Sequence, residues 1–260
     1  MSKILIIKVG STSLVFPQGT LRRKMFKYIV AQIVKARARG YQVVVITSGA
    51  TLAGLRKAPG LASIQDEVLR KRIAASVGQP IVVRAWIEAF AQCGIIAGQV
   101  LRTHADFGRG AAAIASVEFL RRYMECGCVP IINEDDTRSA EEMKAYINEK
   151  GDNDQLAFRV ARALKAERAI LLTDVDGLCR IDDSGKCISE PVQIVRRVNS
   201  AIRNMVRDQP DGRPTGMRSK VNVANKLQRA GITANIANAA KWVIIPILEG
   251  KCVGTTFPAH

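Results

Sequence analysis

Short runs of isoleucine, leucine and valine alternate along the whole chain with longer segments in which apolar residues recur at helical spacing. A strand that reads as an unbroken apolar run is buried on both faces, as in a parallel sheet covered by helices. The intervening segments are long enough for the crossover helices that parallel strands require. The sequence therefore predicts an α/β fold, a three-layer αβα sandwich with a mainly parallel central sheet. The expected strands are residues 4–9, 43–47, 94–100, 129–132, 169–173, 234–237 and 243–247.

Two of the connecting helices can be predicted in detail. Residues 21–39 carry an apolar face opposite basic residues, and Gly40 follows where a helix C-cap is expected. Residues 154–165 form a second amphipathic pattern, and Asp154 stands at its start, where a carboxylate is favoured. The residues expected to face the core are Met25, Ile29, Ile33 and Ala36 in the first helix and Leu156, Val160, Ala163 and Leu164 in the second.

No linker, internal repeat or low-complexity tract divides the chain of 260 residues, so a single domain over residues 1–260 is expected. We expect it to consist of two lobes that share one sheet, an N-terminal lobe of about residues 1–165 and a C-terminal lobe of about residues 166–260. The longest apolar candidate, residues 81–101, is interrupted by Arg84, Glu88 and Gln92, so no unbroken stretch approaches the roughly 20 residues that a membrane span requires. The N-terminus lacks a signal-peptide cleavage site, so a cytoplasmic location is expected.

Six cysteines are scattered along the chain rather than arranged as in small disulfide-rich domains. In a reducing compartment they are expected to stay thiols. Cys126 and Cys128 are separated by one residue, whereas zinc and redox motifs usually have two, and a second ligand pair is missing. No metal site built from protein ligands is therefore expected.

The chain carries 39 basic and 23 acidic side chains, a formal net charge of +16. Many of the basic residues gather between positions 196 and 229, which would suit either a polyphosphate ligand or nucleic acid, or simply a solvated helix face. No RNP aromatic pattern or zinc finger accompanies them. Nucleic acid is therefore not expected as the main partner.

Small and hydroxyl-bearing residues follow the first two expected strands. The first leads into Lys8-Val9-Gly10-Ser11, and the second into Thr47-Ser48-Gly49-Ala50. Glycine lets the backbone approach a ligand closely, free amides can face an anion, and Lys8 adds a positive charge. Both turns would lie at the carboxyl edge of the sheet, where open α/β folds bind ligands. The alternative is an ordinary strand-ending glycine beside a surface lysine.

Carboxylates and amides follow the later strands. They occur in Asn133-Glu134-Asp135-Asp136, in Gly151-Asp152-Asn153-Asp154 and in Thr173-Asp174. Because neighbouring carboxylates repel one another, we expect basic side chains such as Lys220, or Mg²⁺, to lie opposite them. The alternative is a set of solvated loop carboxylates.

Two further matches are attributed to chance. Asp106-Phe107-Gly108 spells a protein-kinase magnesium tripeptide without the rest of the kinase motifs. Asp174-Val175-Asp176-Gly177 begins like a calcium loop but lacks its later ligands.

Taken in order, the motifs of this chain resemble those of the amino acid kinase family, and within it most closely the glutamate 5-kinases. The resemblance covers nearly the whole chain, with nine short motifs in register. The matching pieces are Lys8-Val9-Gly10-Ser11, Thr47-Ser48-Gly49-Ala50, Ala75-Ser76-Val77-Gly78-Gln79, Leu101-Arg102-Thr103-His104, Ile132-Asn133-Glu134, Gly151-Asp152-Asn153-Asp154, Leu171-Leu172-Thr173-Asp174, Gly216-Met217 with Lys220, and Gly254-Thr255 with Phe257.

The resemblance implies the amino acid kinase fold and transfer of the γ-phosphoryl group of ATP, with Mg²⁺, to a side-chain carboxylate of an amino acid. The acceptor it implies is L-glutamate, which gives γ-glutamyl phosphate as in proline biosynthesis. The N-terminal lobe would bind the acceptor and the C-terminal lobe the nucleotide. A homo-oligomer, a dimer or a tetramer, is also implied. Because the chain ends where many bacterial glutamate 5-kinases continue into a PUA domain, only the kinase domain is expected.

The resemblance also implies a role for each matching residue. Lys8 and Lys220 would neutralise the transferring phosphoryl group, and Asp154 would orient the two lysines. The residues that would hold the amino acid are Ser48, Gly49, Ala50, Asn133, Asp136 and Asn153. The residues that would line the nucleotide site are Gly10, Ser11, Thr173, Asp174, Gly216 and Met217.

The chemistry of the acceptor agrees with these roles. A side-chain carboxylate with a pKa of about 4.3 is already ionised at neutral pH and needs no general base. Phosphoryl transfer then depends on positioning and charge stabilisation. A chain whose histidines are limited to His104 and His260 suits that reaction.

The chain departs from the usual family pattern at several positions. A glycine-rich loop is replaced by Arg213-Pro214-Thr215-Gly216-Met217, which removes flexibility and adds a cation beside the expected nucleotide site. Arg138, next to the expected acceptor pocket, would shift selectivity toward another or more acidic carboxylate. Asp135, Cys179 and residues 110–113 also differ. Two alternatives therefore stay open: a kinase for a different carboxylate, and a catalytically idle kinase fold with a basic binding surface.

Overall fold

A seven-stranded sheet in the order β3-β4-β2-β1-β5-β6-β7 organises the protein. The computed structural model describes residues 3–137, 153–182, 187–206 and 216–260. Neighbouring strands are parallel except for β6 and β7, which are antiparallel. The predicted, mainly parallel sheet is thus confirmed. The strands are β1 (Lys3–Val9), β2 (Tyr41–Ile46), β3 (Ala97–Arg102), β4 (Val129–Glu134), β5 (Arg168–Thr173), β6 (Thr233–Asn238) and β7 (Thr255–Phe257).

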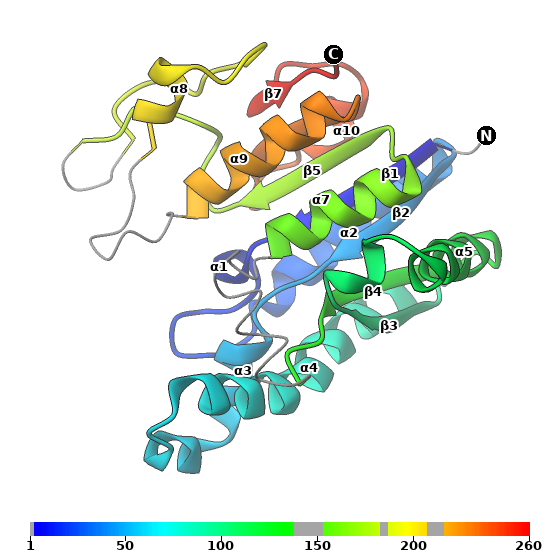
Figure 1. The fold of residues 1–260 in the computed structure, drawn as a ribbon, viewed down its shortest axis with the longest axis vertical. Coiled ribbons are helices and arrows are strands. Elements are labelled where there is room, and N and C mark those ends of the chain that lie inside the picture. Colours follow the sequence, from blue (N-terminus) through cyan, green and yellow to red (C-terminus); the bar gives the residue numbers. More distant parts are fainter. Residues whose placement is uncertain (1–2, 138–152, 183–186, 207–215) are drawn as a thin grey trace.

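Helices cover both faces of the sheet and complete the predicted three layers (Figure 1). Helices α2, α4 and α10 pack on one face, and α5, α7 and α9 on the other. The described helices are α1 (Ser11–Leu14), α2 (Arg23–Ala38), α3 (Ala50–Lys57), η1 (Pro59–Ser63), α4 (Glu67–Ala91), η2 (Ala105–Phe107), α5 (Ala111–Glu125), α7 (Asn153–Leu164), α8 (Ser200–Asn204), α9 (Gly216–Arg229) and α10 (Ile244–Leu248).

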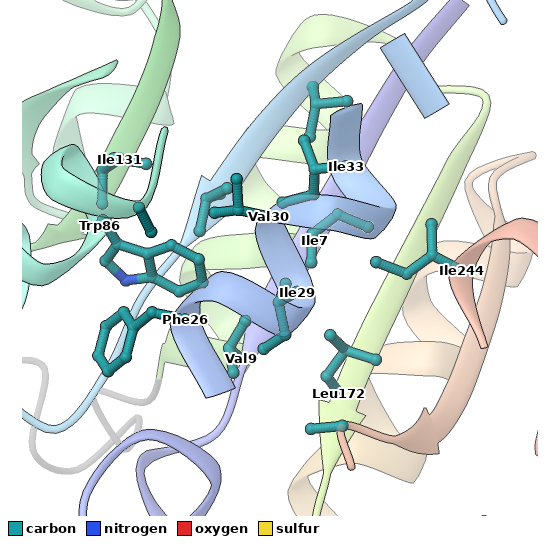
Figure 2. Packing of buried hydrophobic residues seen from close by; sticks show 14 of the residues in the cluster. Ile7, Val9, Phe26, Ile29, Val30, Ile33, Trp86, Ile131, Leu172 and Ile244 are labelled. Atoms are coloured by element: carbon teal, nitrogen blue, oxygen red, sulfur yellow. The ribbon is translucent and has the colours of Figure 1, made fainter. Parts of the chain in front are cut away.

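Large aromatic and β-branched side chains fill the core between the sheet and α2, α4 and α10 (Figure 2). Phe26 of α2 meets the edge of Trp86 of α4, with the ring centroids 4.9 Å apart. Burying one such side chain stabilises the fold by about 1.5–3 kcal/mol. The indole Nε1 of Trp86 also donates a hydrogen bond to Thr47 Oγ1 at 2.8 Å. This bond ties the core to the end of β2, where polar residues begin.

Both helices that were predicted in detail are present. The pattern over residues 21–39 corresponds to α2 (Arg23–Ala38), and Gly40 follows its C-cap with a φ of +85°. The pattern over residues 154–165 corresponds to α7 (Asn153–Leu164), whose first turn contains Asp154. The predicted inward-facing residues lie in or against the core, although Met25 and Ala163 are only partly buried there, while Phe26 of α2 and Ala161 of α7 are buried.

The predicted strand at residues 243–247 was wrong, because this segment forms the short helix α10. An apolar, β-branched run alone does not separate a buried strand from a buried helix. Here the side chain of Gln32 decides: its Oε1 accepts hydrogen bonds from the amides of Val243 and Ile244, both at 2.9 Å, and so caps the helix. The edge strand β7 was not predicted, and β3 starts and ends later than expected.

Two glycines allow α3 to lie directly against α4. A Cβ atom on Gly54 would lie 1.7 Å from the carbonyl oxygen of Ala74, and one on Gly78 would lie 1.8 Å from that of Ala50. Only glycine permits such a close approach of two backbones. The contact fixes the start of α3 beside the middle of α4, and both segments border the polar end of the sheet.

The cysteine prediction was wrong in part. Cys179 and Cys187 form a disulfide, with their Cα atoms 5.7 Å apart. The other four cysteines, Cys93, Cys126, Cys128 and Cys252, are free thiols. Spacing along the sequence did not reveal the pair, because the antiparallel bridge between Ile181 and Cys187 is what brings the two segments together. Within the described ranges, no helix has the length and apolar character needed to cross a membrane.

Candidate functional site

The polar residues that follow the strands meet at one edge of the sheet. Strand β1 is central, with β2 and β4 on one side and β5 and β6 on the other. Since these strands are parallel, their carboxyl ends lie together. The chain adds β2, β3 and β4 on one side of β1 and then β5, β6 and β7 on the other, so the strand order changes direction at β1. Helices α1 and α3 lie beyond this edge, on the side away from the N-terminus (Figure 1). The fold therefore places the candidate residues where parallel α/β sheets bind ligands.

A buried carboxylate between two lysines lies at the centre of this edge. Lys8 comes from the end of β1, Asp154 from the first turn of α7, and Lys220 from α9. Lys8 Nζ lies 2.6 Å from Asp154 Oδ1, and Lys220 Nζ lies 3.3 Å from Asp154 Oδ2. The exposed fractions of the three residues are only 4%, 1% and 6%. Lys220 Nζ also donates to the carbonyl oxygen of Gly216 at 3.3 Å.

The three charges of this group sum to +1, because one carboxylate faces two ammonium groups. Burial alone would raise the pKa of Asp154, but the charges of Lys8 and Lys220 outweigh burial and hold its pKa below the ordinary value. Asp154 is therefore ionised at neutral pH. An excess positive charge in a buried place favours an anion next to the two lysines.

A chain of amide side chains lies on the β2 and β4 side of the lysines. Asn153 Nδ2 donates to Ser48 Oγ at 3.1 Å and to Asn133 Oδ1 at 2.9 Å. Asn133 Nδ2 in turn donates to Gln79 Oε1 at 2.9 Å, and Gln79 Nε2 donates to the backbone carbonyl of Glu134 at 3.0 Å. The network joins β2, β4, α4 and α7 and fixes the direction of each amide.

Asp136 adds a weakly acidic carboxyl group to the cavity that Asn133 and Asn153 line. Burial, and to a smaller extent the neighbouring charge of Asp135, raises the pKa of Asp136 to about 6. Asp135 itself does not line the cavity, and its Oδ1 accepts a hydrogen bond from the hydroxyl of Thr137 at 2.6 Å. A partly desolvated carboxylate of this kind is suited to a cationic group of a ligand, which would restore its usual acidity.

Backbone turns bring main-chain atoms into the same place. Gly10 directly follows β1, and its amide donates to the carbonyl oxygen of Leu172 in β5 at 3.1 Å. Gly49, which precedes α3, has a φ of +94°, and a Cβ atom there would lie 2.6 Å from Val15 Cγ2. A side chain at position 49 would thus be strained in its backbone and blocked by Val15.

The loop after β5 completes the edge on the opposite side. Thr173 Oγ1 donates to Asp174 Oδ1 at 3.2 Å. Asp176 is paired with Lys241 Nζ at 2.8 Å and with Asn238 Nδ2 at 2.9 Å, which lowers its pKa and fixes the loop. These partners agree with the rejection of a calcium loop here. Asp106 likewise accepts from the backbone amide and hydroxyl of Thr103, as a turn-forming residue does.

A cavity of about 630 Å³ lies at this edge of the sheet and connects the lysines, the amides and the glycine turns. All fifteen candidate residues predicted from the sequence line it: Lys8, Gly10, Ser11, Ser48, Gly49, Ala50, Asn133, Asp136, Asn153, Asp154, Thr173, Asp174, Gly216, Met217 and Lys220. Further lining residues had no predicted role, namely Thr12, Thr51, Leu52, Glu134 and Val175. Gln79 lies behind the lining, and only its place in a motif marked it. A second cavity of about 720 Å³ borders α5 and contains none of the candidates.

Some predicted features lie outside the described residues. They are Arg138, Asp152 and the Arg213-Pro214 loop. Among the described parts of the chain, no group of three or more histidine, cysteine, aspartate or glutamate side chains is arranged to hold a metal ion. The cavity lining nevertheless contains more carboxylates than lysines, since Glu134, Asp136, Asp154 and Asp174 line it together with Lys8 and Lys220. Such a lining suits a Mg²⁺ ion held chiefly by phosphate oxygens of a ligand, since Mg²⁺ usually binds proteins through one or two carboxylates.

The chain is similar to several known kinases. Residues 3–238 match the model of the amino acid kinase family. The glutamate 5-kinase of Meiothermus ruber is 36% identical over 255 residues, which is 97% of this chain and 65% of that protein. The glutamate 5-kinases of Thermus thermophilus and Salmonella arizonae are both 34% identical over the full chain, which spans 68% and 70% of their lengths. The chain thus spans about two thirds of these relatives.

Solved structures share the fold at lower identity. An isopentenyl phosphate kinase superposes with a TM-score of 0.65 and 19% identity, over 98% of this chain and 99% of that one. Giardia carbamate kinase gives a TM-score of 0.65 at 15% identity, over 100% and 99%. Bacillus anthracis UMP kinase gives 0.63 at 13%, over 99% and 96%. These likenesses show the three-layer fold and leave the acceptor to be argued from the site.

Proposed function

The chain belongs to the amino acid kinase family, and from this premise we propose that it transfers the γ-phosphoryl group of ATP to the side-chain carboxylate of L-glutamate. The product would be γ-glutamyl phosphate, as in proline biosynthesis. The observation that carries the proposal is the buried group of Lys8, Asp154 and Lys220, with an excess positive charge at the middle of the cavity. An amide and carboxylate pocket, which includes the turn at Gly49, lies on one side of it, and the turn at Gly10 lies on the other.

In the proposed reaction an oxygen of the acceptor carboxylate attacks the γ-phosphorus, and the bond from that phosphorus to the β,γ-bridging oxygen breaks. The carboxylate is ionised at neutral pH and needs no base, in keeping with a described cavity lining without histidine. Lys8 and Lys220 would stabilise the charge on the equatorial oxygens, and Asp154 would hold both lysines in place. Positioning and electrostatics therefore suffice as the catalytic contribution of the protein.

The acceptor would bind in the N-terminal lobe. The backbone at Ser48, Gly49 and Ala50 is available for a carboxylate, while Asp136 and Asn153 offer oxygen atoms for an α-ammonium group. Asn133 supports Asn153 through a hydrogen bond of 2.9 Å. An acidic amino acid that carries both charges would thus span the pocket with its side chain toward the lysines.

The nucleotide would bind in the C-terminal lobe. Its phosphates would lie along the turn of Gly10 and Ser11, next to Lys8 and Lys220, and its remainder near Thr173, Asp174, Gly216 and Met217. Asp174 is the carboxylate best placed on this side to support Mg²⁺. When bound, Mg²⁺ neutralises charge on the phosphate oxygens.

A hydroxylamine assay tests the proposal, because hydroxylamine converts an acyl phosphate into a stable hydroxamate. Purified protein with ATP and Mg²⁺ is expected to give hydroxamate from L-glutamate, in step with ADP release. A panel of aspartate, glutarate and other carboxylic acids serves as comparison. Hydroxamate from one of these acids and none from glutamate would show a different acceptor. Salt-sensitive binding of RNA without any ADP release would instead support the idle kinase fold.

Asp136→Asn is expected to weaken acceptor binding and to stabilise the free protein. The KM for glutamate should rise about 10- to 100-fold, because a charged hydrogen-bond partner of the ammonium group is lost. The raised pKa of Asp136, about 6, means that ionising it in the folded state is unfavourable. At pH 7 the free energy of unfolding of the variant should therefore be about 1–2 kcal/mol higher than that of the unaltered protein. This value is reduced to allow for solvent screening of Asp136. This gain should disappear as the pH falls below about 4.

The unaltered protein supplies the matched control for that variant. Its KM for glutamate should rise as the pH falls through about 6, because Asp136 becomes protonated. The Asp136→Asn variant should show no such change over the range from about pH 5 to about pH 8, because an amide does not titrate there. An identical pH profile for both proteins would show that Asp136 does not hold the ammonium group.

A cytoplasmic location and a homo-oligomer, a dimer or a tetramer, complete the proposal. Support for association comes from apolar side chains left exposed near the edge strand β3. Ile96, Ile114 and Phe119 expose 70%, 70% and 44% of their surface. Such an apolar group on the surface often marks a protein contact.

A further inference from the structure

Gln79 is a buried glutamine in the middle of α4 that touches the candidate site from behind. Only 4% of its surface is exposed, and it does not line the cavity. Its two polar atoms make one hydrogen bond each, to Asn133 Nδ2 at 2.9 Å and to the carbonyl oxygen of Glu134 at 3.0 Å. A buried amide satisfied at both ends has a fixed orientation.

The carbonyl oxygen of Glu134 determines that orientation, because a carbonyl oxygen only accepts hydrogen bonds. Gln79 must turn its Nε2 toward Glu134, and its Oε1 then faces Asn133. Asn133 must therefore donate through Nδ2, and its Oδ1 faces Asn153. A reversed amide at any of these steps would place two oxygens or two amino groups against each other at hydrogen-bonding distance.

The last amide in the chain is Asn153, and its direction follows from the others. Both hydrogens of its Nδ2 are used, one for Asn133 Oδ1 and one for Ser48 Oγ. Its Oδ1 is buried and has no hydrogen-bond partner among the described residues. Asn153 lines the cavity together with Asp136. The side chain of Asn153 thus keeps one unused acceptor atom, in a residue that lines the same cavity as the carboxylate of Asp136.

We infer that Gln79 is a positioning residue that makes this site selective for acceptors with an α-ammonium group. It acts through Asn133 on Asn153, and it keeps Asn153 Oδ1 turned as an acceptor. Without Gln79, Asn133 and Asn153 can reverse together, and the site then offers an amino group where it offered an oxygen. The inference rests on the proposed function, because it assumes that the same cavity holds an amino acid.

Gln79→Met tests the inference, since methionine keeps the length and volume of the side chain and removes both hydrogen bonds. The measurement compares kcat/KM for L-glutamate with kcat/KM for glutarate, which lacks the ammonium group. In the unaltered protein glutamate should be preferred about 10-fold or more, as expected for a hydrogen bond to a charged group. In the variant this preference should fall about 10-fold, through the KM of glutamate, with the KM for ATP changed less than about 2-fold.

Gln32→Met is the matched control. Gln32 is also buried and also bonds backbone groups, but it lies on α2 and does not line the cavity. Its loss should lower the melting temperature and leave the preference for glutamate over glutarate unchanged. If Gln79 has a purely structural role, Gln79→Met should also lower the melting temperature and affect glutamate and glutarate equally. An unchanged preference in Gln79→Met would therefore overturn the inference.

Two measurements keep the test decisive. If Gln79→Met does not fold, Gln79→Leu replaces it. Equal kcat/KM of the unaltered protein for glutamate and glutarate would refute the inference without any variant. If no acceptor is phosphorylated, the proposed function fails. Calorimetric binding of both acids to the unaltered and variant proteins then decides the role of Gln79, and absence of selective glutamate binding refutes it.

Discussion

Lys8→Ala and Lys220→Ala are each expected to lower kcat at least about 100-fold. Each lysine lies within 3.3 Å of the same carboxylate, at the centre of a cavity whose two sides suit an amino acid and a polyphosphate. Removing a single group that stabilises charge in the transition state commonly lowers turnover about 100- to 1,000-fold. Coupled detection of ADP, with glutamate and ATP at saturating concentrations, measures the effect.

Two surface lysines on the same elements provide controls for these variants. Lys3 is exposed at the start of β1, and Lys226 is exposed on α9, where it bonds Gln155. Lys3→Ala and Lys226→Ala should keep kcat within about 2-fold, because neither side chain reaches the cavity. Near-normal turnover in Lys8→Ala and Lys220→Ala would refute the assignment of the two lysines. Melting curves for all four proteins would separate loss of catalysis from loss of fold.

The site could be predicted from the sequence largely because its residues follow strands. Lys8, Ser48, Asn133 and Thr173 each stand at or just beyond the end of an apolar run. In a parallel sheet this position alone brings them to one edge. Lys220 is different, since it lies on a helix far along the chain, and only the resemblance to a known family connected it to Lys8.

What could not be predicted depends on contacts between distant segments. Gln32 of α2 caps the start of α10, and no local signal in an apolar run shows this contact. Strand β7 is only three residues long and exists through its pairing with β6. The orientation of Gln79 is set by one carbonyl oxygen on β4. Each of these features needs a partner from a distant part of the chain. Secondary-structure propensity and hydrophobic periodicity are local and do not predict such contacts.

The central carboxylate is expected to matter as much for stability as for catalysis. Asp154→Asn would leave two buried ammonium groups without a counter-charge, and an asparagine oxygen can face only one of them. Breaking a buried ion pair in this way typically destabilises a protein by about 3–5 kcal/mol. Turnover should fall as well, because Lys8 and Lys220 would no longer be held together. Urea unfolding at pH 7 and steady-state kinetics measure the two effects.

The pH dependence of that loss has a definite sign. The pKa of Asp154 is lowered in the folded state by Lys8 and Lys220, so its contribution to stability is complete above its ordinary pKa of about 4 and is lost as the pH falls through the lower, folded value. The difference between Asp154→Asn and the unaltered protein should therefore shrink in acid. Asp136→Asn, the same substitution in the same cavity, should be stabilising at pH 7, because burial raises the pKa of Asp136 instead. Equal signs for the two variants would show that the lysine charges do not control Asp154.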